Sequence, residues 1–242
     1  MADSYQPIEG GGSLVIAWQI KNKKVLIVGG GNVAAQRIVS VKIGDAQVTL
    51  VAPSDGLHPE VRQRIEHGEV VWLDRTFQDK DVEGMDMVLT ALDDHDESLR
   101  IGHLCRQQRI PVNVADVPDM CDFYFMSQHR DGPLQISVST NGRGPKLANM
   151  IRTTMAQALP PNAGDMVYYM GELRAKVRQW EPKIDQSAKR MGWVTKVCEA
   201  WGLDGMARWT EAAAKDSTLI DTLQPYFDSN QIPTLDMVLP QV

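Results

Sequence analysis

The sequence predicts an α/β fold: a doubly wound parallel sheet, followed by a small mixed α+β segment and an all-helical region. Between Leu14 and about Ala115, short apolar runs alternate with helical patterns, and this alternation is typical of a parallel sheet with helices on both faces. The first apolar run leads directly into three glycines and a helical pattern. After about residue 164 only helical patterns remain, so the sheet must be built from the first half of the chain.

The expected strands are nearly continuous apolar runs, because parallel strands are covered on both faces; they are Val25–Val28, Val48–Val51, Val70–Leu73, Met87–Thr90 and Val112–Ala115. The helices expected between them are Val33–Ile43, Pro59–Glu66 and Glu97–Gln107.

Beyond the sheet, Leu134–Thr140 predicts one further strand, and Pro145 starts a helix that ends before Pro160-Pro161. Four more helices are expected, at about 165–180, 185–201, 205–214 and 216–227. The segment 232–242 is an apolar tail that packs or frays. These patterns predict three domains, at residues 1–115, 116–162 and 163–242.

The composition excludes several classes of protein. An apolar content of 43% in 242 residues is enough for a core, and no apolar run reaches the length of a bilayer span. A net charge of −6 argues against general nucleic-acid binding. Three cysteines without a C-x-x-C pair, and a start without basic residues, favour a cytoplasmic protein over a secreted or imported one.

The glycine cluster after the first strand predicts a dinucleotide site. Gly29, Gly31 and Ala34 fit the pattern G-x-G-x-x-G/A between a strand and a helix. Gly29 permits the tight turn, Gly31 lets a pyrophosphate approach the backbone, and Ala34 lets the helix pack close to the strand. The helix start offers unpaired N–H groups to phosphates. The alternative is a glycine-rich turn that binds nothing.

The end of the second strand favours NAD over NADP. It reads Val51-Ala-Pro-Ser-Asp55, with no acid at the tip and no arginine before Arg62 that could pair with a 2′-phosphate. We expect Ser54 and the backbone at Pro53 to contact the ribose, although the same residues also suit a plain turn and helix cap. Thr90, at the end of the fourth strand, is expected to line the same site.

Asp116 is the candidate catalytic residue. It follows the last core strand, beside the expected position of the nicotinamide. A partly desolvated carboxylate there would be suited to act as a general base near neutral pH. The alternative is an Asx turn ahead of Pro118.

Basic residues cluster downstream in spite of the negative net charge. Arg143, Lys146 and Arg152 surround the helix that Pro145 starts, and Arg174 and Arg178 are i, i+4 neighbours on one helical face. They form either a solvated face or a site for a polycarboxylate.

These pieces, in this order, resemble the siroheme synthase family and specifically its bifunctional fungal type. The resemblance covers residues 14 to about 180 and is most specific at Asn113–Phe123. The matching segments are Val28-Gly-Gly-Gly-Asn-Val-Ala, Leu50-Val-Ala-Pro-Ser, Thr90-Ala-Leu-Asp-Asp, Asn113-Val-Ala-Asp-Val-Pro-Asp-Met-Cys-Asp-Phe, Ile136-Ser-Val-Ser-Thr-Asn-Gly and Gly171-Glu-Leu-Arg.

The resemblance implies a Rossmann-type NAD-binding domain, a central segment that forms a homodimer, and a helical C-terminal domain. It implies that precorrin-2 is oxidised to sirohydrochlorin with NAD as hydride acceptor, and that Fe²⁺ then enters as a substrate to give siroheme. The family's key aspartate matches Asp116. The implied NAD contacts are Asn32, Val33, Pro53, Ser54, Phe77 and Thr90. The candidate substrate-binding residues are Asn113, Thr140, Arg143, Lys146, Arg152, Arg174 and Arg178. No His/Cys cluster suggests a resident metal.

Some features depart from the family, and alternatives stay open. Arg143-Gly-Pro stands where relatives have a serine before the proline, and the match is poor beyond about residue 200. No uroporphyrinogen methyltransferase domain is expected. One alternative is a dehydrogenase alone, with a separate chelatase; another is an NAD-sensing regulator without turnover, which the position of Asp116 disfavours. A short-chain dehydrogenase needs Tyr-x-x-x-Lys, which none of the five tyrosines provides.

Overall fold

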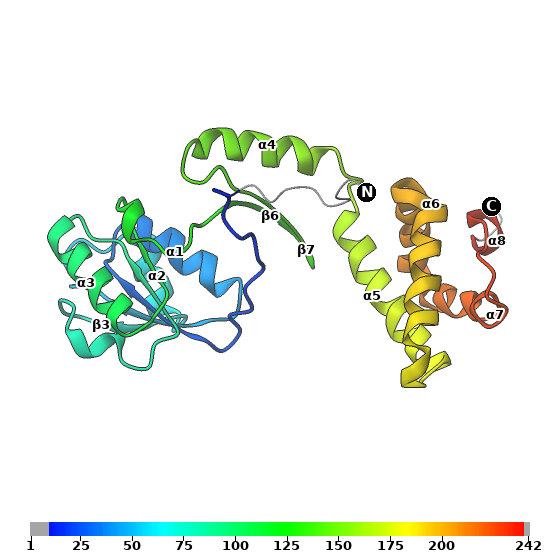
Figure 1. The fold of residues 1–242 in the computed structure, drawn as a ribbon, viewed down its shortest axis with the longest axis horizontal. Coiled ribbons are helices and arrows are strands. Elements are labelled where there is room, and N and C mark those ends of the chain that lie inside the picture. The colour runs from blue at the N-terminus through cyan, green and yellow to red at the C-terminus, as the bar shows by residue number, and fades with distance from the viewer. Residues whose placement is uncertain (1–9, 240–242) are drawn as a thin grey trace, which may run out of the picture. The chain divides into compact units, whose positions relative to one another are not determined.

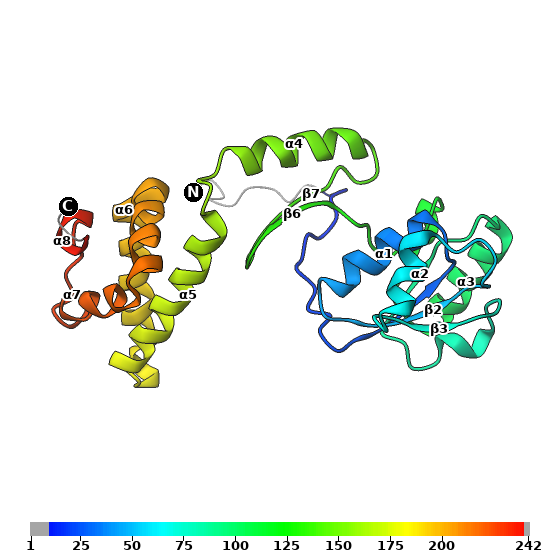
Figure 2. The same ribbon diagram turned by 180° about the vertical axis from the view of Figure 1, so that it is seen from behind.

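The computed structural model describes residues 10–239 and divides the chain into two compact units, with the division between Phe125 and Met126. The first unit holds the parallel sheet and its helices, and the second holds a hairpin and the C-terminal helices (Figure 1, Figure 2).

The first unit contains a five-stranded parallel sheet in the order β3-β2-β1-β4-β5. The strands are Lys24–Val28 (β1), Gln47–Val51 (β2), Val71–Leu73 (β3), Met87–Thr90 (β4) and Val112–Val114 (β5). The helices are Asn32–Lys42 (α1), Pro59–Glu66 (α2) and His95–Gln107 (α3), with short 3₁₀ helices at Asp79–Val82 (η1) and Pro118–Met120 (η2). All five predicted strands and all three predicted helices are confirmed; the two 3₁₀ turns were not predicted.

Helices cover both faces of this sheet, as the sequence predicted. Val25 and Ile27 of β1 pack into one apolar cluster with α1 and α2, while Leu26 and Val28 pack into another with α3. Successive side chains of a strand point to opposite faces, so each central strand serves two cores. This is the reason for the unbroken apolar runs.

Residues 116–125, which the sequence analysis assigned to a middle segment, pack with the first unit. Val117 and Met120 join the α3-side cluster, and Phe123 and Phe125 pack against the α1-side cluster. The segment therefore wraps from one face of the sheet to the other, and the division at Phe125 lies about ten residues after the expected one at 115.

The second unit begins with the antiparallel hairpin Ser127–Asp131 (β6) and Leu134–Val138 (β7), followed by the helix Pro145–Gln157 (α4). β7 and α4 were predicted. β6 was missed, because its sequence Ser-Gln-His-Arg-Asp has no apolar residue and hence no alternation to detect.

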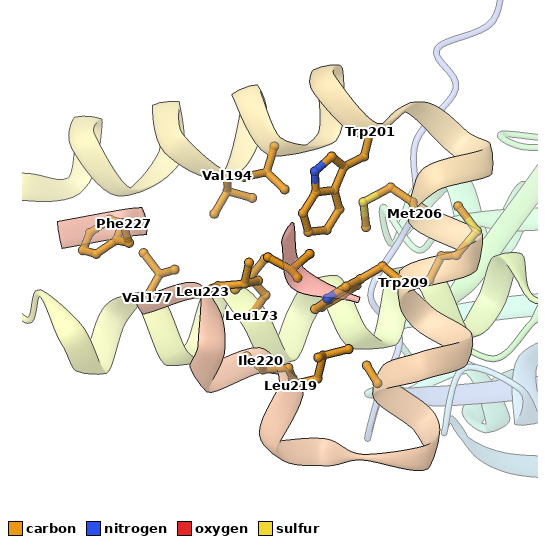
Figure 3. Close-up of a cluster of buried hydrophobic side chains, with 14 of the residues drawn as sticks. Leu173, Val177, Val194, Trp201, Met206, Trp209, Leu219, Ile220, Leu223 and Phe227 are labelled. Carbon is orange, nitrogen blue, oxygen red and sulfur yellow. The ribbon is translucent and has the colours of Figure 1, made fainter. Parts of the chain in front are cut away.

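The helices that follow are Ala163–Trp180 (α5), Ser187–Lys215 (α6), Gln224–Asp228 (α7) and Leu235–Val238 (α8), with 3₁₀ turns at Ile184–Gln186 (η3) and Ser217–Leu223 (η4). They enclose an apolar core that includes the fully buried Trp209, Leu223 and Phe227 (Figure 3). Non-helical geometry at Gly202 bends α6 between Trp201 and Met206 (Figure 3), where the sequence predicted two separate helices.

The tail packs as far as it is described. Trp201 Nε1 donates to the carbonyl oxygen of Pro233 at 2.9 Å, and Val238 is buried in the same core. The remaining tail residues, 240–242, lie outside the described residues. Among residues 10–239, no helix combines the length and the apolar character needed to cross a lipid bilayer.

Candidate active site

The carboxyl ends of the parallel strands meet at one edge of the first unit. β1 is central: the chain runs outward to β2 and β3 on one side and to β4 and β5 on the other. Ligands of open parallel sheets bind at such a switch point. The β1–α1 turn lies there, with the Gly29 amide bonded to the carbonyl oxygen of Val51 at 2.9 Å and the Ala91 amide bonded to that of Val28 at 2.8 Å.

The three glycines of this turn have different roles. Gly29 has φ +115°, and a Cβ there would collide with the carbonyl oxygen of Ala91. A Cβ on Gly30 would collide with Leu57, so this glycine, which the sequence pattern did not single out, is needed for packing. A Cβ on Gly31 would meet no atom within 4 Å. The backbone at Gly31 is therefore open to a ligand, as predicted for the residue beside a pyrophosphate.

The start of α1 completes an anion-binding cradle. Gly31 is its N-cap, no side chain caps the helix, and its first turn contains no acidic residue. Asn32 and Val33 are exposed there. A helix N-terminus carries unpaired N–H groups and a partial positive charge, so this end of α1 fits the phosphates of a dinucleotide.

At the tip of β2, the structure supplies an acid that the sequence pattern lacked. Pro53 and Ser54 are exposed, and the Ser54 amide donates to Asp74 Oδ1 at 2.6 Å. Asp74 follows β3, the neighbouring strand. Asp74 was not predicted, because the sequence pattern places the acid on β2 itself; the signal was an acid at the end of the next strand.

Thr90 and Phe77, two further predicted cofactor contacts, lie on or near the α3 side of the sheet. Thr90 ends β4 and is buried, and its Oγ1 has no hydrogen-bond partner among residues 10–239. An orphaned hydroxyl at this edge fits a ligand that supplies the missing bond. Phe77 is half-buried, and the guanidinium carbon of Arg100 lies 5.6 Å from its ring centre. This contact is structural, and the role of Phe77 at the cofactor stays a prediction.

Asp116 lies where the sequence placed it, two residues after β5 at the ligand-binding edge. It has φ +60°, in the left-handed region that aspartate enters more readily than most residues. Its side chain is exposed, so the first unit does not provide the partial desolvation that the sequence analysis expected. Held on a turn with no neighbour enclosing it, the carboxylate is accessible to a bound molecule.

Cys121 and Asn113 brace the turn that carries Asp116. Cys121 Sγ donates to the carbonyl oxygen of Val114 at 3.1 Å and accepts from its amide at 3.3 Å. Burial raises the pKa of the Cys121 thiol, which keeps it a donor. Asn113 is buried, and its Nδ2 donates to the carbonyl oxygen of Phe123 at 2.8 Å. Its Oδ1 has no hydrogen-bond partner among residues 10–239, so the substrate-binding role of Asn113 stays a prediction beside its role in holding this turn.

Arg37 is a neighbour of Asp116 that sequence reasoning missed. Its guanidinium carbon lies 4.1 Å from the ring centre of Phe125. Burial lowers the pKa of Arg37, and the nearby Cys121 and Asp116 partly oppose this effect. The sequence does contain a signal for it: Arg37 is a charged residue on the same face of α1 as the buried Ala34, Ile38 and Val41.

The other predicted substrate-binding residues lie in the second unit. The hydroxyl oxygen of Thr140 accepts from the Gly144 amide at 3.2 Å, which shapes the turn before α4. Arg143 and Lys146 are exposed and Arg152 is half-buried. Arg174 and Arg178 line a cavity between α5 and α6, which the residues around α4 do not reach. Within residues 10–239, no three His, Cys, Asp or Glu side chains gather as a metal site.

Comparisons with known proteins match this architecture from end to end. A family model described as NAD(P)-binding matches residues 16–127. Models for the central and C-terminal regions of sirohaem biosynthesis proteins match residues 131–158 and 160–231. The three models follow one another in the order of the sheet unit, the hairpin with α4, and the C-terminal helices.

Two curated relatives differ in how much of them this chain covers. Siroheme biosynthesis protein met8 of Schizosaccharomyces pombe is 48% identical over 228 residues, which are 94% of this chain and 84% of that protein. Siroheme synthase of Thioalkalivibrio sulfidiphilus is 34% identical over 180 residues, which are 72% of this chain and 35% of that protein. The chain thus spans about a third of the length of the bacterial enzyme.

Among solved structures, SirC, precorrin-2 dehydrogenase, matches with a TM-score of 0.63 and 17% identity over 90% of this chain and 98% of that one. At this identity the likeness supports the fold. The fission-yeast protein matches nearly the whole chain at 48% identity, and the chain therefore belongs to the siroheme biosynthesis protein family.

Proposed function

We propose that this protein oxidises precorrin-2 to sirohydrochlorin with NAD as the hydride acceptor. The observation that carries the proposal is the position of Asp116: an exposed carboxylate on a braced turn, at the same sheet edge as the open backbone of Gly31. The name of the SirC neighbour and membership of a siroheme biosynthesis family support the choice of substrate.

The cradle at the β1–α1 turn would hold the pyrophosphate of NAD. Gly31 leaves room for it, and the first amides of α1, at Asn32 and Val33, would face it. Asp74 beside Ser54 favours NAD over NADP, because a carboxylate near the ribose repels a 2′-phosphate. When bound, NAD accepts a hydride from a carbon of the substrate.

Asp116 would balance this oxidation. Precorrin-2 loses two hydrogens on becoming sirohydrochlorin: one leaves as a hydride with both bonding electrons, and the other must leave as a proton. The carboxylate of Asp116 accepts that proton as a general base. The bonds of Cys121 to Val114 hold the backbone of the turn that presents this carboxylate.

Insertion of Fe²⁺ into sirohydrochlorin is the second reaction that we propose. Two pyrrole N–H protons must leave as the ion enters; the same carboxylate can accept one of them or guide the cation, and the solvent takes up the remainder. Iron is a substrate in this scheme. The alternative is a dehydrogenase alone, with a separate chelatase completing the pathway.

The second unit would contribute substrate binding and dimer formation. Its basic residues suit a tetrapyrrole with eight carboxylates, and they are Arg143, Lys146, Arg152, Arg174 and Arg178. On α4, Leu147, Met150, Ile151 and Met155 form an exposed apolar stripe. Its i, i+3, i+4 spacing is that of a helix–helix contact, which supports a homodimer through this segment. With three free thiols, we place the enzyme in the reducing cytoplasm.

An anaerobic assay of NADH formation from precorrin-2 tests the first reaction. Asp116→Ala should lose most turnover, because the variant has no general base at this position. It should still fold and bind NAD normally, because the exposed side chain of Asp116 has no part in the core. Asp119→Ala, an exposed carboxylate three residues away, is the matched control and should keep its activity. Normal turnover by Asp116→Ala would remove this residue from the mechanism.

The second reaction is tested by mixing the protein with sirohydrochlorin and Fe²⁺ and following the change in absorbance. Siroheme should form faster than without protein, and Asp116→Ala should slow it. A rate equal to the protein-free rate would mean that the protein is a dehydrogenase only and does not insert iron.

A further inference from the structure

A cavity of about 210 Å³ lies between α5 and α6 in the second unit. α5 contributes Arg174, Val177 and Arg178, spaced i, i+3, i+4 on one face. α6 contributes its first residue, Ser187, and then Arg190, Met191 and Val194 on one face. Three arginines from two successive helices are thus brought around one small space.

The charges in this cavity are not compensated by the protein. Among residues 10–239, none of the three arginines forms an ion pair with a carboxylate. Arg178 has no hydrogen-bond partner there, and Arg174 Nη2 reaches only the sulfur of Met191, at 3.7 Å. Like charges placed together repel one another, so their convergence without an acid points to an anionic ligand.

One arginine is held in place while the other two remain available. Arg190 Nη1 donates to the carbonyl oxygens of Glu181 and Lys183, in the connection just after α5. This fixes its guanidinium at the end of the cavity where the two helices join. Arg174 and Arg178 are exposed and can turn their planar donors toward a ligand.

Two valines of the cavity lining are buried and apolar. Val177 and Val194 belong to the buried core of the helical region, and Figure 3 shows them on α5 and α6 respectively, on either side of that core. A lining that combines valine side chains with guanidinium groups suits a ligand with both hydrocarbon and anionic parts. The N-terminus of α6 at Ser187 adds a hydroxyl and a partial positive charge.

We infer that this arginine pocket (Arg174, Arg178, Ser187 and Arg190) binds carboxylate groups. Planar guanidinium groups pair with carboxylates in a bidentate manner. Because 210 Å³ is below the roughly 300–1,000 Å³ of typical small-molecule sites, the pocket takes a short carboxylate arm or a small polycarboxylate. Assignment to an arm of the tetrapyrrole rests on the proposed function; the alternative source is a free polycarboxylate.

Citrate is the probe for the pocket itself. Isothermal titration of the full-length protein should show saturable binding, weakened at least tenfold in the double variant Arg174→Gln/Arg178→Gln. Arg208→Gln, an exposed arginine on α6 outside the pocket, should bind citrate as the parent does. Circular dichroism checks that each variant is folded. This measurement involves no turnover, so it stands apart from the test of the proposed function.

The Michaelis constant for precorrin-2 distinguishes the two sources. If the pocket holds an arm of the substrate, the double variant raises the Michaelis constant at least tenfold with little change in the turnover number, and citrate competes with precorrin-2. If it holds a free polycarboxylate, citrate binds in the parent but the Michaelis constant is unchanged. No saturable citrate binding together with an unchanged Michaelis constant would overturn the inference. Absence of NADH formation by the parent protein would instead refute the proposed function, and citrate binding would still decide the chemistry of the pocket.

Discussion

The amide of Ser54 donates a hydrogen bond of 2.6 Å to Oδ1 of Asp74, which joins the tips of two neighbouring strands. Ser54 follows β2 and Asp74 follows β3, 20 residues later in the chain. The bond fixes the loop that lies beside the glycine turn. It also places a carboxylate near the position where a dinucleotide-binding sheet needs an acid for the ribose.

Asp74→Ala should therefore weaken NAD binding. The variant loses both the bond to the Ser54 loop and the negative charge, and a charged hydrogen bond contributes about 1.5–3 kcal/mol, so the dissociation constant for NAD should rise at least about tenfold. A fluorescence titration with NADH measures it. Asp55→Ala, an exposed acid on the same loop, is the control. Equal affinities for both variants would exclude Asp74 from the cofactor site.

Gly31→Asp should strongly weaken NAD binding and leave the fold intact. A Cβ at Gly31 meets no atom within 4 Å, so the protein tolerates the side chain, but a negative charge at the start of α1 repels a pyrophosphate. Calorimetric titration with NAD should show a loss of affinity of about a hundredfold or more, near 2.7 kcal/mol. Gly12→Asp, also in open space, should bind normally. Unchanged affinity of Gly31→Asp for NAD would show that the cofactor does not bind at this turn.

Gly29→Ala should destabilise the protein itself. Its positive φ of +115° disfavours any side chain, and the new Cβ would collide with backbone at Ala91. We expect a loss of at least about 2 kcal/mol in the free energy of unfolding, measured with urea. Gly68→Ala shares a positive φ but faces open space and should cost less. Equal losses of unfolding free energy in Gly29→Ala and Gly68→Ala would show that the backbone moves to relieve the collision at Gly29.

The stability of the first unit should depend on the charge of Asp81. Arg75 donates to both carboxylate oxygens at 2.7 Å, and this side-chain bonding lowers the pKa of Asp81. A carboxyl group with a lowered folded-state pKa stabilises the fold above its unfolded-state pKa, and this contribution is lost as the pH falls through the folded-state value.

Asp81→Asn should accordingly lower the melting temperature by a few degrees at pH 7. The difference from the parent should shrink as the pH falls below about 4, where the unfolded parent's carboxyl group becomes protonated, and should vanish below the lowered pKa of the folded state, where the native carboxylate is protonated too. Differential scanning calorimetry across pH measures it, with Asp93→Asn, an exposed acid, as the control. A difference that stays constant with pH would mean that ionisation of Asp81 is not the cause.

Ile151→Glu should disrupt the proposed dimer. Ile151 lies in the exposed apolar stripe of α4 and is 40% exposed in the single chain, and a buried unpaired charge in an interface is strongly unfavourable. Light scattering after size-exclusion chromatography should give the mass of a dimer for the parent and of a monomer for the variant. Asn149→Glu adds the same charge outside the stripe and should remain dimeric. A monomeric parent would refute the dimer directly.

The architecture of the first unit, and the position of Asp116 just after β5, could be predicted from the sequence. Strands buried on both faces are apolar at most positions, so β1, β2 and β4 are recognisable without any tertiary knowledge. Asp116 could be placed for the same reason, because the end of a parallel strand and the ligand-binding edge of the sheet coincide.

Other features were decided only by the tertiary structure, since they depend on residues far apart in the chain. β6 is a polar strand that pairs with β7 and has no periodic signal of its own. Asp74 reaches Ser54 only because β2 and β3 are neighbours in the sheet. Arg190 joins Arg174 and Arg178 only because α5 and α6 pack face to face. A local pattern records how each segment is buried, whereas which segments lie side by side is settled by the packing of the whole unit.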